Sequence, residues 1–542
     1  MNKPFAAVSR AAGHVPIDLD AVIVGAGFAG LYMLHRLRQM GLRARVVEAA
    51  DGIGGTWYWN AYPGARCDIE SLEYSYQFDE ALQQEWRWTE RYATQPEILR
   101  YLNHVADRFD LRRDIRLGMR VVTAIFNEPS ACWTVETNGG ERLTARYCIM
   151  ATGCLSSPNA PAIAGSETFE GRIYHTGRWP HEPVDLAGHR VAVIGTGSSG
   201  IQVIPEIAKV AAQLTVFQRT PSYTVPARNA PLDPAVERRV KADYPSFRLR
   251  ASEMLIGAHM NHRDVSALDT GPAERVAEYE ARWQAGGTSF LAAFNDVLIH
   301  PEANETAAEF VRAKVRTIVA DPATAERLTP RHPVGCKRLC LDTDYYDTFN
   351  RANVRLVDVS RKPIEAIVPG GLQVAGEVYG ANAIVFATGF DALTGALERI
   401  DIRGRGGLTL KEKWSGGART YLGLQIEGFP NLFTVTGPQS PSVLTNMVPS
   451  IEQHVNFIAD AIAHMRSRGV LTVEPLALAE DAWVKHVNAI ASATVYASCN
   501  SWYLGANVPG KPRSFLAHLG YPAYVQRCRQ VVANGYEGFA FQ

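Results

Sequence analysis

The chain has 542 residues, too many for a single hydrophobic core, which predicts two to four domains. Its 46% hydrophobic and 20% charged residues are ordinary for a soluble globular protein. The 55 basic and 55 acidic residues cancel, so no charge excess suggests a nucleic-acid partner, and no run of 18 apolar residues suggests a membrane span.

The first predicted element is a strand that leads into a glycine-rich turn and a helix. The apolar run 21–24 precedes Gly25-Ala26-Gly27-Phe28-Ala29-Gly30, and a helical pattern follows. In such a turn the first glycine bends the chain, the second admits a pyrophosphate, and the third lets the helix pack on the strand. The next apolar run ends at Glu48, where a carboxylate can accept hydrogen bonds from both ribose hydroxyls. This unit therefore predicts a site for FAD or NAD.

A second turn of the same form lies 170 residues further along the chain. The apolar run 191–194 precedes Gly195-Thr196-Gly197-Ser198-Ser199-Gly200, and the next strand reaches Gln218 and then Arg219 and Thr220. A carboxylate there would repel a 2′-phosphate, whereas an arginine beside a neutral glutamine can pair with it. The second unit therefore predicts a site for NADP. One such turn is weak evidence, but two complete units favour two dinucleotides.

Two strands that end in Thr-Gly, at 147–153 and 384–389, predict where the chain passes between domains. We predict an α/β fold with two Rossmann-like domains. The FAD domain is assigned to 1–153 and 391–542, the NADP domain to 154–222 and 334–390, and an inserted helical subdomain to 223–333. Within the insertion, apolar spacing predicts a helix that begins at an Asn304 cap.

Two further motifs carry a resemblance to a known family. Residues 169–180 have the pattern F-x-G-x-x-x-H-x-x-x-W-P, through Phe169, Gly171, His175 and Trp179. Gly54-Gly55-Thr56-Trp57, Tyr62-Pro63-Gly64 and Asp68 form the second pattern. With these motifs the chain resembles the type I Baeyer–Villiger monooxygenases over nearly its whole length. Stretches such as 216–220 and 502–511 are most similar to the phenylacetone and steroid monooxygenase branch.

The resemblance implies a reaction and its central residues. NADPH would reduce FAD, O2 would add at C4a of the flavin, and the peroxyflavin would convert a ketone to an ester or lactone. Arg338 is implied to contact the flavin peroxide, and Asp68 to hold Arg338. A fixed guanidinium stabilises anionic oxygen without readily surrendering a proton. A purely structural ion pair is the alternative for both residues.

The remaining cofactor-site predictions each have an ordinary alternative. His175 is expected to hydrogen-bond backbone and couple domain movement rather than act as a general base, and Trp179 to pack. Lys337 either joins the 2′-phosphate site or is a solvated lysine, and Trp502 either shapes the substrate pocket or belongs to the core. The predicted cofactor contacts are Gly25, Gly27, Gly30, Glu48, Gly55, Thr56, Trp57, Asp68, Gly195, Thr196, Gly197, Ser198, Ser199, Gly200, Arg219, Thr220, Lys337, Arg338 and Trp502.

The predicted substrate pocket is built from Cys154, Ser442, Val443, Leu444 and Trp502. Such a lining suits bulky apolar ketones, aryl or cyclic. Two residues depart from the most similar relatives, since Cys154 replaces residues such as Gln and Gln439 occupies a glycine position. The identity of the ketone therefore stays open.

Two competing functions were weighed against ketone oxygenation. A flavin monooxygenase that oxygenates nitrogen or sulfur is the nearest, and Trp179-Pro180 with the Asp68 and Arg338 pair argues against it. A non-catalytic redox-sensing flavoprotein is the other, and it need not keep this complete set of residues. The eight cysteines form no C-x-x-C pair, which argues against a zinc or dithiol site and favours the cytoplasm. A monomer or weak homo-oligomer is expected.

Overall fold

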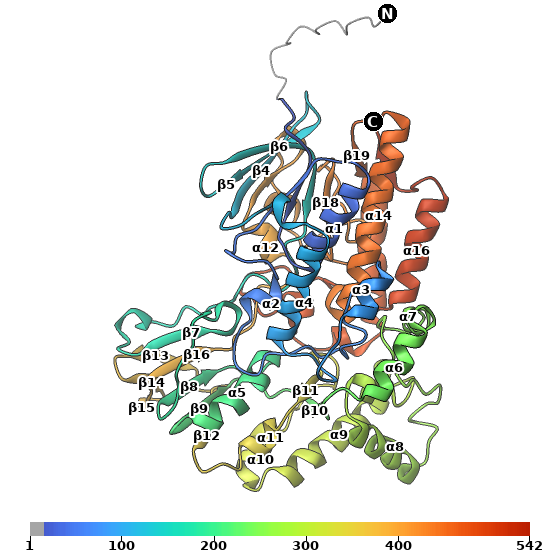
Figure 1. Cartoon of the computed structure of the whole chain (residues 1–542). Coiled ribbons are helices and arrows are strands. Elements are labelled where there is room, and N and C mark those ends of the chain that lie inside the picture. The colour runs from blue at the N-terminus through green and yellow to red at the C-terminus, as the bar shows by residue number, and fades with distance from the viewer. Residues whose placement is uncertain (1–15) are drawn as a thin grey trace, which may run out of the picture.

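The structure is a computed structural model that describes residues 16–542, so the first fifteen residues of the predicted FAD domain lie outside the described residues. Two separate sheets dominate it (Figure 1), one at the top of the view and one at the lower left, with a group of helices at the lower right. Among the described residues, no helix is long and apolar enough to cross a membrane.

The first sheet has eight strands. In spatial order they are β17 (Asp401–Arg403), β4 (Val121–Asn127), β5 (Cys132–Thr137), β6 (Arg142–Met150), β1 (Leu19–Val24), β2 (Ala44–Val47) and β3 (Ile115–Arg116), with β18 (Leu432–Thr434) beside β6. The central strand β1 is buried and runs parallel to β2 and β6, with Val24 opposite both Val47 and Met150. Because carboxyl ends of parallel strands meet at one edge, Gly25, Glu48 and Ala151 come together there.

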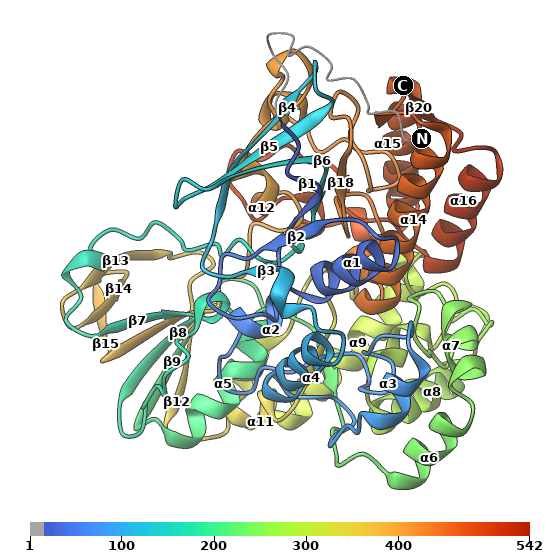
Figure 2. The same cartoon turned by 45° about the horizontal axis from the view of Figure 1, so that its top comes forward.

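Helices cover this first sheet and extend its core. They include α1 (Phe28–Gln39), α2 (Thr56–Trp59), α3 (Glu80–Glu85), α4 (Gln95–Arg108), α14 (Met447–Arg468), α15 (Ala477–Ser492) and α16 (Tyr521–Ala533). Helices α1 and α14 lie side by side in both views (Figure 1 and Figure 2). Strands β17 and β18 and helix α14 thus bring the last part of the chain back to the first sheet.

The second sheet consists of five parallel strands in the order β12 (Val354–Asp358), β9 (Gln213–Gln218), β8 (Arg190–Ile194), β16 (Ala383–Phe386) and β7 (Arg172–His175). Helix α5 (Ser198–Val210) packs on it. A small antiparallel sheet of β13 (Ile364–Val368), β14 (Gly371–Val374) and β15 (Glu377–Gly380) lies beyond this sheet at the far left (Figure 2). Both glycine turns therefore follow a central parallel strand, and the predicted α/β class with two Rossmann-like units is confirmed.

The helical region between the two parts of the second unit contains α6 (Pro234–Ala242), α7 (Tyr244–Ser252), α8 (Pro272–Ala285), α9 (Pro301–Ile318) and α10 (Pro322–Leu328). Val240 and Tyr244, from α6 and α7, are buried in the hydrophobic core of the first unit. Helices α8 and α9 contribute to a separate core, in which Val311 is fully buried. The domain boundaries given above stay a prediction.

The predicted Asn304 cap is wrong. Helix α9 begins at Pro301, whose missing N–H costs nothing at a first helical position, and His300 precedes it. Asn304 instead lies inside the helix and is buried. Its amide donates to Val297 O at 2.9 Å and to Val334 O at 2.8 Å and accepts the Val334 N–H at 2.9 Å. The side-chain amide of Asn304 thus satisfies backbone groups of Val297 and Val334, and Val334 is remote in sequence. The local sequence pattern did not indicate these contacts.

Candidate active site

The first glycine turn is closed by contacts that only glycine permits. A Cβ at Gly30 would lie 1.8 Å from Gly25 O, so the helix and the turn approach too closely for any side chain. Helix α1 begins directly after Gly27, which aims its first N–H groups at the space in front of the turn. A Cβ at Gly27 would lie 3.4 Å from the Cα of Gly55, so Gly55 borders this space. The cradle fits the pyrophosphate of a dinucleotide.

Glu48 lies at the turn as predicted. Its carboxylate is 5% exposed and accepts the Ala26 N–H at 2.7 Å and the Ala50 N–H at 2.8 Å. Burial raises the pKa of Glu48, while these backbone donors lower it. The residue is thus fixed beside the cradle, in a position that fits the ribose of FAD.

The second turn repeats the close approach but leaves its middle open. A Cβ at Gly200 would lie 2.3 Å from Gly195 O, whereas a Cβ at Gly197 would meet nothing within 4 Å. Helix α5 begins after Gly197 at Ser198, whose hydroxyl contacts Cys340 Sγ at 3.2 Å; Ser199 follows in the first turn. Thr196 donates its hydroxyl to Thr220 O at 3.1 Å, which joins the turn to the end of β9. A second pyrophosphate fits here.

Two cations lie beyond β9. Burial lowers the pKa of Lys337, and the positive charge of Arg219 lowers it further. Arg219 is exposed and, within residues 16–542, has no ion pair. Gln218 is buried, and its amide donates to Arg327 O at 2.7 Å. Two neighbouring cations without a carboxylate partner fit a phosphate group, such as the 2′-phosphate of NADP.

The Arg338 side chain contacts Asp68, 270 residues away in the sequence. Its Nε and Nη2 donate to Asp68 Oδ2 at 2.9 and 2.5 Å, and its Nη1 donates to Val443 O at 2.8 Å. Burial lowers the pKa of Arg338, but the Asp68 carboxylate outweighs burial and the pKa is raised. The guanidinium is therefore permanently charged and held on two sides.

The backbone fixes both ends of this pair. Arg338 lies just before β11 (Cys340–Asp342), which pairs in parallel with β10 (Thr224–Pro226). Next to Asp68, Cys67 donates its N–H to Ala93 O at 3.0 Å. The pair thus joins an element of the first unit to an element that follows the helical region.

The Tyr62-Pro63-Gly64 motif contacts the second unit directly. The Tyr62 hydroxyl donates to Gln202 Oε1 at 2.8 Å, and Gln202 donates to Arg66 O at 3.0 Å. A Cβ at Gly64 would lie 2.5 Å from Gln202 O, so the motif packs tightly on α5. Upstream, Thr56 is exposed at the start of α2, and Trp57 is buried and donates to the Tyr74 hydroxyl at 3.2 Å. This segment holds the two units together.

The segment 169–180 makes structural contacts. His175, at the end of β7, accepts the Gly177 N–H at Nδ1, 2.9 Å away, and its Nε2 lies 3.4 Å from the Thr388 hydroxyl. Burial lowers the pKa of His175, which keeps the imidazole neutral near pH 7. Trp179 is buried and donates its N–H to Trp59 O at 3.3 Å. These contacts are those expected of a connector, while its part in domain movement stays a prediction.

The first residues of the same segment lie at the edge of the second sheet. Phe169 is half-buried, and a Cβ at Gly171 would lie 2.2 Å from Asn382 O. Strand β7 therefore can pair with β16 only if residue 171 is glycine.

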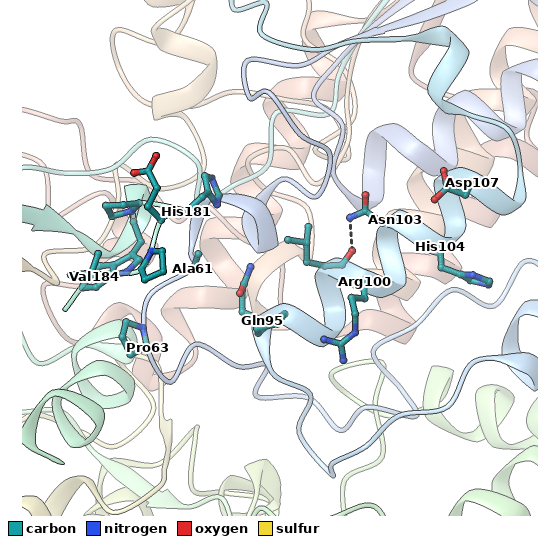
Figure 3. Close-up of a pocket in the computed structure, with 15 residues that line it drawn as sticks. Ala61, Pro63, Gln95, Arg100, Asn103, His104, Asp107, His181 and Val184 are labelled. Atoms are coloured by element: carbon teal, nitrogen blue, oxygen red, sulfur yellow. Dashed lines mark hydrogen bonds between the residues drawn. The ribbon is translucent and has the colours of Figure 1, made fainter. Parts of the chain in front are cut away.

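An open groove of about 890 Å³ lies where the two motifs meet. Gln95 and Arg100 of α4 line one side, and His181 and Val184 line the other (Figure 3). Neither Arg338 nor Asp68 lines it. The groove therefore marks the seam between the units and is separate from the Arg338 site.

The predicted substrate-pocket residues share one apolar cluster. Val443 and Cys154 are buried in it, and Leu444 and Trp502 pack against it while partly exposed. Burial raises the pKa of Cys154 to about 12, although the positive charge of Arg338 opposes this shift. Ser442 is buried, and its hydroxyl has no hydrogen-bond partner among the described residues. These apolar side chains and the Ser442 hydroxyl therefore adjoin Arg338, which donates a hydrogen bond to the Val443 carbonyl oxygen.

Gln439 precedes this loop and is fully buried. Its φ of +69° is left-handed, which explains why glycine suits the position. The buried amide donates to Ala418 O at 2.9 Å and accepts the Thr420 N–H at 3.0 Å. These two bonds compensate for the backbone cost of a side chain there.

Two features of the site were missed by the sequence analysis. Tyr503 is buried beside Arg338; burial raises its pKa and Arg338 lowers it. Cys336 and Cys499 form a disulfide although 163 residues separate them, whereas the scattered cysteines had favoured a reducing setting without any pairing. In the sequence, only its position next to Trp502 could have placed Tyr503 at the site. No spacing of the cysteines indicates the Cys336–Cys499 pairing.

Two dinucleotide cradles, a buried carboxylate at the first and two cations without a carboxylate partner at the second fit a flavoprotein oxidoreductase that uses NADP(H). Comparisons with known proteins agree. The family model described as pyridine nucleotide-disulphide oxidoreductase matches residues 22–265. A Baeyer–Villiger monooxygenase of Pseudooceanicola batsensis is 43% identical over 96% of both chains. A phenazine N-monooxygenase of Lysobacter antibioticus is 40% identical over 96% of both chains.

Among solved structures, an oxidised steroid monooxygenase bound to NADP is 51% identical, with a TM-score of 0.92 over 96% of this chain and 99% of that one. The chain therefore belongs to the Baeyer–Villiger monooxygenases, flavin enzymes that depend on FAD and NADPH. The resemblance seen in the motifs is thus confirmed at the level of family, enzyme class and cofactors. The roles of single residues stay predictions.

Proposed function

We propose that this enzyme uses NADPH and O2 to insert an oxygen atom beside the carbonyl of bulky apolar ketones, aryl or cyclic, with Arg338 as the catalytic residue. The observation that carries the proposal is Arg338, held by Asp68 and placed against the apolar wall at Val443. Bound FAD would supply the activation of O2. The protein supplies position, charge and exclusion of water.

Arg338 supports this chemistry through its charge. Oxygen transfer to a carbonyl requires an anionic oxygen donor, which a fixed cation stabilises and a nearby acid would neutralise. The raised pKa of Arg338 means that it does not release its proton near neutral pH. Asp68 fixes the plane of the guanidinium, and the Val443 carbonyl supplies a third anchor.

The two nucleotide cradles complete the proposed roles. Gly25, Gly27, Gly30 and Glu48, bordered by Gly55, would hold FAD; Gly197, Arg219 and Lys337 would hold NADPH. The domain assignment follows from these roles, with 1–153 and 391–542 binding FAD, 154–222 and 334–390 binding NADP, and 223–333 inserted.

A second candidate is oxygenation of nitrogen, because the phenazine N-monooxygenase is about as similar as relatives named as acetone and cyclohexanone monooxygenases. Attack by nitrogen requires a protonated oxygen donor. Arg338 favours the anionic form, so ketone oxygenation is the preferred reading.

A panel of substrates tests the proposal. The purified holoenzyme is supplied with NADPH and ¹⁸O2 and offered an aryl ketone, a steroid ketone, cyclohexanone, an alkyl sulfide and phenazine. We expect labelled esters or lactones to form fastest from the bulky ketones. Labelled N-oxide in place of esters would support the second candidate, and NADPH oxidation that yields only hydrogen peroxide would contradict both.

For its setting, we propose a cytoplasmic protein that is a monomer or weak homo-oligomer. Six of the eight cysteines are free thiols, which supports a reducing compartment, where the Cys336–Cys499 disulfide would be a transient bond. Size-exclusion chromatography with light scattering tests the oligomeric state, and a stable dimer or tetramer at micromolar concentration would contradict it.

A further inference from the structure

The disulfide connects two segments that both contribute to the proposed site. Cys336 directly precedes Lys337 and Arg338, and Cys499 lies three residues before Trp502. The Cα atoms of the two cysteines are 6.1 Å apart. Beside the bridge, Lys337 Nζ donates to Asn500 O at 3.1 Å. The bridge therefore fastens residues 499–505 to the cations proposed to bind NADPH.

The surroundings of this pair are polar, with one imidazole and one cation nearby. The imidazole Nδ1 of His332 lies 3.6 Å from Cys336 Sγ, and the positive charge of Lys337 is on the next residue. Cys499 is half-buried, so a small oxidant has access from its side. Burial lowers the pKa of His332, so its imidazole is neutral near pH 7 and Lys337 is the neighbouring cation. A neighbouring cation and partial access are conditions under which cysteine reacts with oxidants.

The other six cysteines are different. All are buried free thiols, and burial raises the pKa of each: Cys67, Cys132, Cys148, Cys154, Cys340 and Cys528. A buried thiol with a raised pKa is chemically inert near neutral pH. Cys336 and Cys499 thus differ from the other six cysteines in being bonded to each other and in the partial exposure of Cys499.

We propose that Cys336 and Cys499 form a reversible oxidation site for hydroperoxides, and that the bridge slows the exchange of NADP(H). The oxidant is hydrogen peroxide, which reduced flavin and O2 give when no substrate receives the oxygen. The Cys499 thiolate attacks the peroxide, the O–O bond breaks, and a sulfenic acid and water form. The Cys336 sulfur then displaces the hydroxyl as a second water. Two thiols lose two electrons and two protons, and one peroxide becomes two waters.

The consequence for exchange rests on the proposed role of Lys337 and Arg219 at the nucleotide. In the bridged protein, Cys499 and Asn500 stay beside Lys337 and cannot move away from it. In the dithiol protein, the Lys337 to Asn500 contact is a single exposed hydrogen bond, which opens easily. Peroxide from uncoupled turnover would therefore slow the turnover that generates it.

Thiol mapping and nucleotide release test the proposal together. The FAD-loaded enzyme is reduced with a thiol reductant, freed of it, and treated with one equivalent of hydrogen peroxide. Peptide mass spectrometry after alkylation is expected to find the cross-linked peptides of Cys336 and Cys499 and six alkylated cysteines. The dissociation rate of NADP+, measured by displacement of the bound nucleotide, is expected to be several-fold lower in the oxidised protein.

Two variants control the measurement. Cys499→Ser is expected to release NADP+ at the rate of the reduced wild type, with or without peroxide. Cys528→Ala, which removes a buried thiol from α16, is expected to respond to peroxide as the wild type does. A bridge that forms without slowing release, or equal release rates in all forms, would overturn the regulatory role. A protein that binds NADP+ but forms no bridge would overturn the redox site alone, and one that bridges without binding NADP+ would overturn the nucleotide site instead.

Discussion

The two glycine turns have the same chemistry and opposite surroundings. At the first, Gly27 faces the backbone of Gly55, and Glu48 is buried against two backbone N–H groups. At the second, Gly197 faces open space, and the cations Arg219 and Lys337 have no carboxylate partner in the described part of the chain.

This difference matches the different duties of two cofactors. A flavin stays bound through many turnovers, and a covered cradle with a fixed ribose contact favours retention. A nicotinamide coenzyme must enter and leave each time, and an open cradle beside cations without a carboxylate partner favours exchange. The sequence motif G-x-G-x-x-G specifies the turn, but its neighbours decide how tightly the ligand is enclosed.

The largest expected effect in this comparison comes from Gly197→Ala. The added Cβ meets no protein atom, so the fold should be unchanged, but it lies where the pyrophosphate must approach the backbone. We expect the Kd for NADPH to rise by on the order of tenfold, about 1.4 kcal/mol, or more.

Gly271→Ala is the matched control, because Gly271 also precedes a helix, α8, with open space at its Cβ. Calorimetry and thermal unfolding should give it normal NADPH binding and a melting temperature similar to that of Gly197→Ala. Normal NADPH affinity in Gly197→Ala would show that this turn does not contact the pyrophosphate.

A more selective effect of comparable size is expected from Arg219→Ala. Loss of one charge-assisted contact to the 2′-phosphate should cost NADPH roughly 1–3 kcal/mol and leave NADH nearly unaffected. Steady-state kcat/KM for both coenzymes measures this. Arg361→Ala, an exposed arginine of the loop after β12, should change neither. Equal losses for NADPH and NADH would remove Arg219 from the phosphate site.

The smallest effect concerns pH and the helix beside the first turn. His454 on α14 is buried and accepts the Thr436 N–H at 3.0 Å, and burial lowers its pKa to about 3. The unfolded chain binds a proton near pH 6.5 and the folded protein does not, so the stability from His454 is present above pH 6.5 and is lost as pH falls towards 3. The loss is up to about 1.4 kcal/mol per pH unit in this window.

His454→Asn keeps an acceptor for Thr436 but cannot be protonated in this range. Between pH 7.5 and 5.5, its apparent melting temperature should fall less than that of the wild type. His189→Asn, at an exposed position, should behave as the wild type does. Parallel pH curves for His454→Asn and the wild type would refute the assignment.

The sequence could predict elements whose cause is local. The buried strands β1, β2, β8 and β9 follow from short apolar runs bounded by turn residues, and the glycine turns follow from the motif. Glu48 and Arg219 could be placed because each follows directly after a strand end.

Features that depend on distant pairing could not be predicted from local pattern. The contact of Arg338 with Asp68 was expected only from the family resemblance, and nothing indicated that the Val443 carbonyl joins it. Asn304 resembled a helix cap because its partner Val334 is remote in sequence. The pairing of Cys336 with Cys499 likewise depends on how two loops meet.

The central claim is that Arg338, held by Asp68, stabilises the oxygen donor in the reaction rather than the fold. The most direct measurement is the ratio of ester formed to NADPH consumed by FAD-loaded Arg338→Ala, with a ketone that the wild type converts. We expect FAD to stay bound, because Glu48 and the first turn form its proposed cradle, and ester formation to fall by on the order of 10²-fold or more. Arg338→Lys should recover little, since one flexible ammonium cannot replace the planar guanidinium. An alanine variant that forms ester at a near-normal rate would contradict the claim, and the assigned role of Asp68 would be withdrawn with it.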